Sequence, residues 1–167
     1  MTNPPVSPIW TRRAFFDSYG ETPNQRLAPT PTYGIRISCP CCGYPTLHDR
    51  GGFEICYLCW WEDDGQDENT LHVVRGGPNG GYSLEQARLN FDVYLVMYEP
   101  QNDTRLGGPD SHDVLELKQS VVAAFEALLL DPSPEHLPEL WAAVKAGEKQ
   151  LHKALKESIR RYERENA

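Results

Sequence analysis

The chain has 167 residues, with 16 Lys and Arg against 24 Asp and Glu, so its formal net charge is −8. This length fits one domain, or a small module with a helical partner region. The hydrophobic content of 40% and the aromatic content of 10% are sufficient for a packed core and exclude wholesale disorder. An acidic chain repels phosphate backbones, so nucleic acid is not expected as its main ligand.

The first 38 residues contain six of the fourteen prolines, which predicts an extended or turn-rich arm without helical periodicity. The arm also carries aromatic residues, among them Trp10, Phe15 and Phe16, which are not typical of an inert tail. Two interpretations stay open. The arm packs on the protein's own helices, or it inserts into a partner and becomes ordered there.

All five cysteines lie between Cys39 and Cys59. An odd number in so short a segment argues against a disulfide framework and indicates metal binding in a reducing compartment. The start of the chain lacks the basic-then-apolar layout of a secretory signal, and no apolar run approaches the ~20 residues that span a bilayer. We therefore expect a cytoplasmic protein that does not enter a membrane.

Four of these cysteines form two C-x-x-C pairs, Cys39–Cys42 and Cys56–Cys59, which are separated by thirteen residues. Each C-x-x-C turn brings two sulfurs to one side of a tight loop, and two facing turns complete a tetrahedral site. Four protein ligands leave no open coordination position, which marks a structural site. The sequence therefore predicts one structural Zn²⁺ per chain, bound by Cys39, Cys42, Cys56 and Cys59.

Short strands are expected at 44–47 and 53–55, paired as a hairpin between the two cysteine pairs. Cys41 remains as a spare thiol and is expected to act as a small residue in the turn. His48 is expected at the surface or near the metal ligands, and not as a ligand. Trp60 and Trp61 are predicted to cover the metal cluster.

The densest acidic stretch follows the second pair and contains Glu62, Asp63, Asp64, Asp67 and Glu68, with no basic residue among them. One interpretation is a solvated turn beside the metal site. The other is a docking surface for a basic partner, where complementary charge speeds the encounter and rejects wrong partners. We also expect Arg88 to pair with Glu62 or Asp63.

Three helices are predicted after this stretch. Their expected bounds are Ser83 to Pro100, Ser111 or His112 to Leu130, and Pro134 or Pro138 onward. Gln86 completes a capping box with Ser83, proline is tolerated only in the first turn of a helix, and Gly147 is a candidate break. Residues 145–167 carry 7 basic and 4 acidic side chains, against 9 and 20 in residues 1–144.

The predicted fold is therefore α+β, with a small four-cysteine, zinc-ribbon-like module that contains a short β-hairpin, followed by an α-helical region of about three helices. The expected organisation is an arm at 1–38, a zinc-binding module with its helix at 39–99, and a helical region at 100–167.

Three segments, CPCCGYPTL at 39–47, GGFEICYLCWWEDDGQD at 51–67 and GGPNGGYSLEQARLNF at 76–91, resemble the cysteine-rich CPCC family of bacterial proteins. The resemblance implies a zinc-ribbon-like module followed by a helix. Because domains of this family often accompany bacterial toxin systems, it also implies an immunity role.

We expect a non-catalytic zinc-binding protein that acts through protein–protein interaction, in its most specific form an immunity protein that neutralises a basic toxin domain. The predicted partner-binding residues are Trp10, Phe15, Phe16, Glu62, Asp63, Asp64, Asp67 and Glu68.

Two alternatives belong to other functional classes. The first is an enzyme, which would use the Cys41 thiol in redox chemistry or a zinc-bound water with His48 as a ligand and Glu54 as a base. The second is a nucleic-acid-binding zinc ribbon that uses the basic residues of 145–167. Acidic residues interleave with them at helical spacings, which favours a self-paired, solvated face instead.

Overall fold

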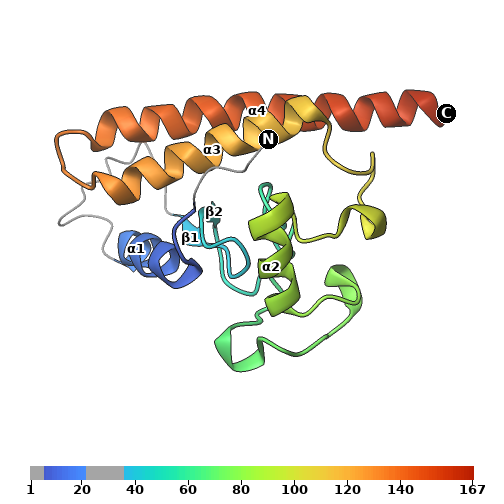
Figure 1. Cartoon of the computed structure of the whole chain (residues 1–167), viewed down its shortest axis with the longest axis horizontal. Helices are drawn as coiled ribbons and strands as arrows, with labels where there is room; N and C mark the ends of the chain where they lie inside the picture. The colour runs from blue at the N-terminus through green and yellow to red at the C-terminus, as the bar shows by residue number, and fades with distance from the viewer. Residues whose placement is uncertain (1–5, 22–35) are drawn as a thin grey trace.

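The computed structural model describes residues 6–21 and 36–167. Its elements are α1 (Ile9–Glu21), β1 (Ile37–Ser38), β2 (Pro45–Leu47), η2 (Glu68–Thr70), η3 (Gly77–Asn79), α2 (Leu84–Tyr94), η4 (Pro100–Asn102), α3 (His112–Leu130) and α4 (Leu137–Glu165). The architecture is α+β, as predicted, with a two-stranded antiparallel sheet near the cysteine cluster. Figure 1 shows α3 and α4 running antiparallel as one layer, with α1, the strands and α2 beneath them.

The predicted second helix is confirmed as α3, which Ser111 caps by accepting a hydrogen bond from the Val114 N–H. The helix α4 continues unbroken through Gly147, so the candidate break there is wrong. A Cβ atom added at Gly147 would lie 3.1 Å from Val121 Cγ2 of α3. Glycine therefore serves here to let α3 and α4 approach closely.

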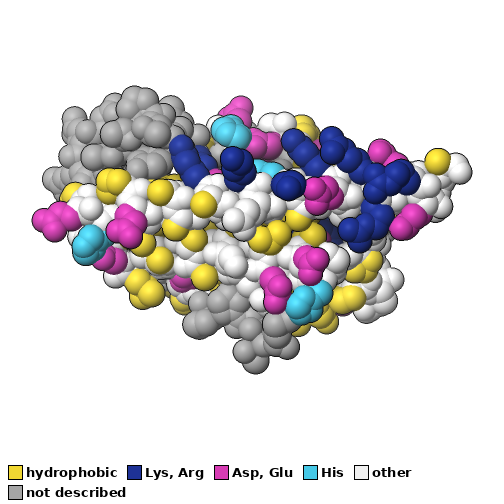
Figure 2. All heavy atoms as spheres, turned by 90° about the horizontal axis from the view of Figure 1, so that it is seen from above, with side chains coloured by type: hydrophobic (Ala, Val, Ile, Leu, Met, Phe, Trp, Pro, Cys, Tyr) yellow, Lys and Arg dark blue, Asp and Glu magenta, His cyan; other side chains and the backbone are white. Residues whose placement is uncertain are grey.

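Lys and Arg side chains gather over the C-terminal half of α4 (Figure 2). Lys153 and Glu157 of this surface lie 4.0 Å apart, one helical turn from each other. Among the residues that the structure describes, no helix combines the length and the apolar character needed to cross a lipid bilayer.

The N-terminal arm contains a helix, α1, which the sequence did not predict. The carbonyl of Pro8 accepts hydrogen bonds from the N–H groups of Thr11 and Arg12 and so begins the helix. The inward face of α1 includes Arg12 and Phe16, which are 2% and 0% exposed. Because a charged residue occupies a buried position, the apolar period that would have indicated a helix is interrupted. Pro23, Pro29 and Pro31, on which the extended prediction partly rested, lie outside the described residues.

The cysteine pairs lie at the tips of two separate hairpins, and not at the ends of a shared one as predicted. The strand β2 pairs with β1, with Ile37 opposite Leu47. The segment 53–56 pairs with 61–63 through the hydrogen bonds Phe53 N–H to Asp63 O and Cys56 N–H to Trp61 O, both 2.9 Å. Each C-x-x-C turn reverses the chain tightly enough that its own flanks form the ladder.

The helix α2 begins as predicted, with Ser83 and Gln86 forming a reciprocal capping box. It ends at Tyr94, before the predicted end at Pro100, because Leu95 adopts a left-handed conformation with φ of 55°. The chain then turns back toward the second cysteine pair, where the Met97 N–H donates to the Cys59 carbonyl at 2.7 Å. This hydrogen bond fixes the end of α2 against the second cysteine pair.

One aromatic core joins the cysteine-rich part to the helices. The Tyr44 ring stacks on Phe125 of α3 with centroids 5.2 Å apart, and Phe16 of α1 contacts Phe125 at 5.7 Å. The Tyr44 hydroxyl donates to Glu126 Oε1 at 2.6 Å. The hairpin with the first cysteine pair is therefore held from above by α3 and from the side by α1.

Candidate metal centre

The sulfur atoms of Cys39, Cys42, Cys56 and Cys59 all lie within 4.8 Å of one another. The Sγ–Sγ distances are 3.6 Å for Cys39–Cys59 and 3.7 Å for Cys42–Cys56. A disulfide would need about 2.05 Å, so these are free thiols. A tetrahedral ion with metal–sulfur bonds of about 2.3 Å has sulfur–sulfur edges of about 3.8 Å. The four sulfurs therefore have the spacing of a tetrahedral metal site.

Hydrogen bonds from the surrounding chain orient these sulfurs. The Cys59 N–H lies 3.5 Å from Cys56 Sγ, and the Trp61 N–H lies 3.4 Å from Cys59 Sγ. The Thr46 hydroxyl is 3.0 Å from Cys56 Sγ. Donors aimed at ligand sulfurs favour their thiolate form and fix their direction, as is usual around metal sites.

Burial dominates the protonation of the four thiols. All four are fully buried, and this burial raises the pKa of Cys39, Cys42 and Cys59 well above the ordinary value. Burial also acts to raise the pKa of Cys56, but hydrogen bonds from the other three thiols lower it well below the ordinary value. Several thiolates together in this apolar interior are stable only when a bound cation neutralises their charge. The donor chemistry therefore fits a thiolate-binding metal ion.

The remaining cysteine and the nearby histidine stand outside this group. Cys41 is buried beside the tetrad but is not one of its four members, in agreement with the predicted register. The side chain of His48 is 77% exposed, and its Nδ1 lies 2.8 Å from Glu54 Oε1. His48 therefore lies at the surface, where its ring contacts a carboxylate and not the cysteines.

The structure corrects two residues of the predicted partner surface. Phe16 is fully buried between Tyr44 and Phe125, and Asp63 is 1% exposed. The Asp63 carboxylate accepts the N–H groups of Gly51 at 2.8 Å and Gly65 at 3.2 Å, so it holds two turns together. Neither side chain can contact a partner, because each is already enclosed by the protein itself.

Three further residues of the predicted partner surface make contacts with other parts of the same protein. Phe15 is half-buried against Phe16. Asp64 and Asp67 accept backbone N–H groups of their own turns, from Gln66 at 3.1 Å and Asn69 at 2.9 Å. Trp10, by contrast, is 71% exposed. Much of the acidic stretch therefore supports its own loop, as the solvated-turn interpretation requires.

Arg88 pairs with Glu68, and not with Glu62 or Asp63 as predicted. Arg88 Nη2 lies 2.7 Å from Glu68 Oε1, to which Arg13 Nη1 also donates at 2.9 Å. These two arginines, Arg88 first, lower the pKa of the Glu68 carboxyl. Arg88 Nε also donates to the Pro40 carbonyl at 2.9 Å. Arg88 thus ties α2 to the first cysteine turn and, through Glu68, to α1.

Trp61 is fully buried beside the cluster, as predicted, whereas Trp60 is partly exposed. Trp60 adopts a positive φ of 72°. The Arg105 guanidinium lies over its ring, 5.5 Å from the centroid. Trp60 therefore belongs to the contact with the segment before α3.

The comparisons with known proteins place this site in a family. Residues 37–109 match the family model described as "Cysteine-rich CPCC". This segment is a cysteine-rich CPCC module. The match covers both cysteine pairs and α2, and it ends before α3, so α1, α3 and α4 lie outside the CPCC module. No match was found among curated proteins or solved structures.

Asn79, which is not among the predicted site residues, is important to the structure of the CPCC module. Asn79 is buried in η3, where its Oδ1 accepts the Glu62 N–H at 3.0 Å and its Nδ2 donates to the Glu62 carbonyl at 2.9 Å. One amide side chain thus satisfies both backbone groups of a residue in the second hairpin. The Asn at the centre of the Gly-Gly-Pro-Asn-Gly-Gly loop was the available signal, because such a residue often bonds to backbone.

We expect Asn79→Ala to lower the free energy of unfolding by about 1–3 kcal/mol, because it leaves a partly buried N–H and a carbonyl without their partner. Urea unfolding of the metal-loaded protein measures this loss. Asn69→Ala, at an exposed position, is the matched control and should change stability little. Equal unfolding midpoints for the two variants would contradict the assignment.

Proposed function

We propose that the protein is a non-catalytic binding protein whose CPCC module is stabilised by zinc. The complete burial of all four candidate ligands is the observation that carries this proposal. Four cysteine thiolates complete the tetrahedral coordination of Zn²⁺, and a closed, buried site has no position for a substrate or a reactive water. Zinc is the proposed metal because two C-x-x-C pairs at this spacing are the usual ligand set of structural zinc.

If the metal is structural, function lies at the surface, and one surface of the CPCC module has the character of a binding site. Phe53 is 60% exposed and Ile55 is 48% exposed. Glu62, partly exposed, lies opposite Ile55 across the second hairpin. We call these three residues the hairpin face. Exposed aromatic and aliphatic side chains beside a carboxylate are typical of protein interfaces.

The backbone of Phe53 supports this assignment. Its φ of 59° is in the left-handed region, which costs a residue other than glycine about 1–2 kcal/mol. The hydrogen bond from Phe53 N–H to the Asp63 carbonyl holds it there. An exposed aromatic side chain kept at the expense of strain is better explained by binding than by folding, because backbone strain collects at functional sites.

The partner that we propose is a basic protein, since the chain carries a net charge of −8 and complementary charge steers association. In its most specific form, this is an immunity protein that binds and neutralises a basic toxin domain, as the resemblance to the CPCC family implies. Trp10 and Asp67, both exposed, remain available to such a partner.

Phe53→Gly tests the proposal without weakening the fold. Glycine relieves the positive φ, so we expect the variant to be at least as stable as the parent protein but to lose its partner. The tagged, zinc-loaded protein is used to capture partners from its own host, and mass spectrometry identifies them. Leu130→Ser, which changes another exposed apolar residue at the end of α3, should capture the same partner as the parent protein. A partner that Phe53→Gly captures equally well would contradict the hairpin face, and the absence of any captured protein would contradict the binding role.

A further inference from the structure

A cavity of about 500 Å³ lies between the glycine-rich loop at 77–81, the first turns of α2 and the segment at 98–104. Two tyrosines form an aromatic corner in it. The rings of Tyr82 and Tyr98 meet nearly at right angles, at 84°, with centroids 5.8 Å apart. The corner is fixed in place, because Tyr98 is largely buried and the Tyr82 hydroxyl accepts the Glu99 N–H at 3.3 Å.

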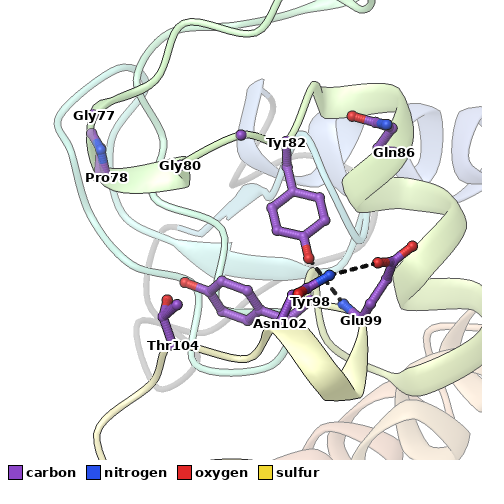
Figure 3. A pocket seen from close by; sticks show the side chains of 10 residues that line it. Gly77, Pro78, Gly80, Tyr82, Gln86, Tyr98, Glu99, Asn102 and Thr104 are labelled. Atoms are coloured by element: carbon purple, nitrogen blue, oxygen red, sulfur yellow. Dashed lines mark hydrogen bonds between the residues drawn. The ribbon is translucent and has the colours of Figure 1, made fainter.

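Glu99 provides the charge of this pocket. Figure 3 shows the Asn102 amide reaching the Glu99 carboxylate next to the tyrosine rings. The hydrogen bonds from Asn102 at 2.9 Å and from Gln101 at 3.3 Å both go to Glu99 Oε2. Within residues 6–21 and 36–167, no hydrogen bond to Oε1 is observed. Glu99 is therefore oriented by its neighbours and keeps one oxygen for a ligand.

In the part of the chain that the structure describes, no Lys or Arg lines the pocket beside Glu99. Arg105, which follows the last lining segment, is bound by Asp103 at 2.7 Å and Asp110 at 2.8 Å, with its side chain 4% exposed. The pocket thus combines a carboxylate with aromatic rings, whose faces carry negative potential and attract cations.

We propose that this pocket binds the guanidinium group of an arginine side chain from the partner protein. A guanidinium is planar, stacks on aromatic rings and donates to a carboxylate oxygen, which are the two features that the pocket offers. The proposal rests on the proposed binding function, since the arginine belongs to the basic partner.

The glycine-rich loop connects the pocket to the hairpin face. Its wall includes Gly77, Pro78 and Gly80 of the glycine-rich loop. Asn79, within that loop, holds the Glu62 backbone through two hydrogen bonds. The loop that forms the pocket wall is thus bonded to the hairpin that would bind the partner, so one partner can supply the arginine as an anchor.

The test is a titration of the zinc-loaded, 167-residue protein with N-acetyl-arginine methylamide, in which binding is followed by the shifts of the amide NMR signals. We expect the shifts to concentrate in the glycine-rich loop. The matching citrulline derivative, which has nearly the same shape without the charge, should bind much more weakly. Equal binding of the two compounds would overturn the proposal and indicate a neutral ligand.

Glu99→Gln should weaken binding of the arginine derivative by about fivefold, the upper range for an accessible ion pair. Glu163→Gln, the same change on an exposed residue of α4, should bind it as the parent protein does. Unchanged affinity in Glu99→Gln would overturn the assignment. This result is distinguishable from a failure of the proposed function, because partner capture and its loss in Phe53→Gly are measured separately.

Discussion

Replacing Cys56 with serine is expected to abolish metal binding and to unfold the CPCC module at room temperature. Cys56 is one of the four cysteines of the cluster, and its Sγ lies 3.7 Å from Cys42 Sγ and 3.0 Å from the Thr46 hydroxyl. Structural zinc contributes about 10–16 kcal/mol to the folding of small domains, which matches or exceeds the ~5–15 kcal/mol stability of a typical protein. The strands themselves are two and three residues long and cannot replace that contribution.

The measurements are zinc per chain by elemental analysis and near-ultraviolet circular dichroism, which reports on the packing of the aromatic side chains, Trp60 and Trp61 among them. We expect one zinc per chain in the parent protein, none in Cys56→Ser, and loss of the near-ultraviolet signal. Cys41→Ala is the matched control, because it removes a buried thiol that is not part of the tetrad. A Cys56→Ser variant with full zinc content and an unchanged melting temperature would contradict a zinc-dependent fold.

The features that the sequence predicted correctly depend on short-range chemistry. Two C-x-x-C pairs can place four sulfurs together only by facing each other, and the structure brings the predicted four together. The capping residues Ser83 and Ser111 could also be predicted, because a capping side chain bonds to a backbone N–H no more than three residues further along the chain. The family model matches residues 37–109, which contain the same local motifs, and so confirms the predicted resemblance for this segment.

The features that the sequence did not predict depend on contacts between segments that are far apart in the chain. Arg12 is a charged residue, but it is buried with its guanidinium 4.9 Å from the centroid of the Tyr44 ring. Asp63 belonged to an acidic run and looked solvated, but two glycine N–H groups of separate turns converge on it. Charge pattern and hydrophobic periodicity depend on the neighbours of a residue in the sequence. The burial of its side chain depends on which distant segments pack against it.

Glu148 makes the clearest contact between segments that are distant in the sequence. It joins the CPCC module to a helix outside the family match. It is largely buried on α4. Arg36, which precedes β1, donates to its two oxygens at 2.6 and 3.0 Å. Tyr57, inside the second cysteine turn, donates its hydroxyl to the same carboxylate. Burial, followed by the charge of Glu148, raises the pKa of Tyr57 well above its ordinary value, so this hydroxyl stays a donor.

Replacing Glu148 with alanine is expected to lower the free energy of unfolding by about 3 kcal/mol, the lower end of the cost of breaking a buried ion pair. The lower end applies because Arg36 also lies over the Trp141 ring, at 5.4 Å from its centroid. Urea unfolding of the zinc-loaded protein measures the change. The zinc content should stay at one per chain, since Glu148 is not among the sulfur ligands.

The matched control for this change is Glu157→Ala on the same helix. Glu157 is exposed and lies 4.0 Å from Lys153, so the loss should be below about 0.5 kcal/mol. If the two alanine variants unfold at the same urea concentration, Glu148 does not fasten α4 to the CPCC module. If Glu148→Ala instead loses its zinc while Glu157→Ala keeps it, α4 supports the metal site itself, and the module does not fold independently of the helices outside the family match.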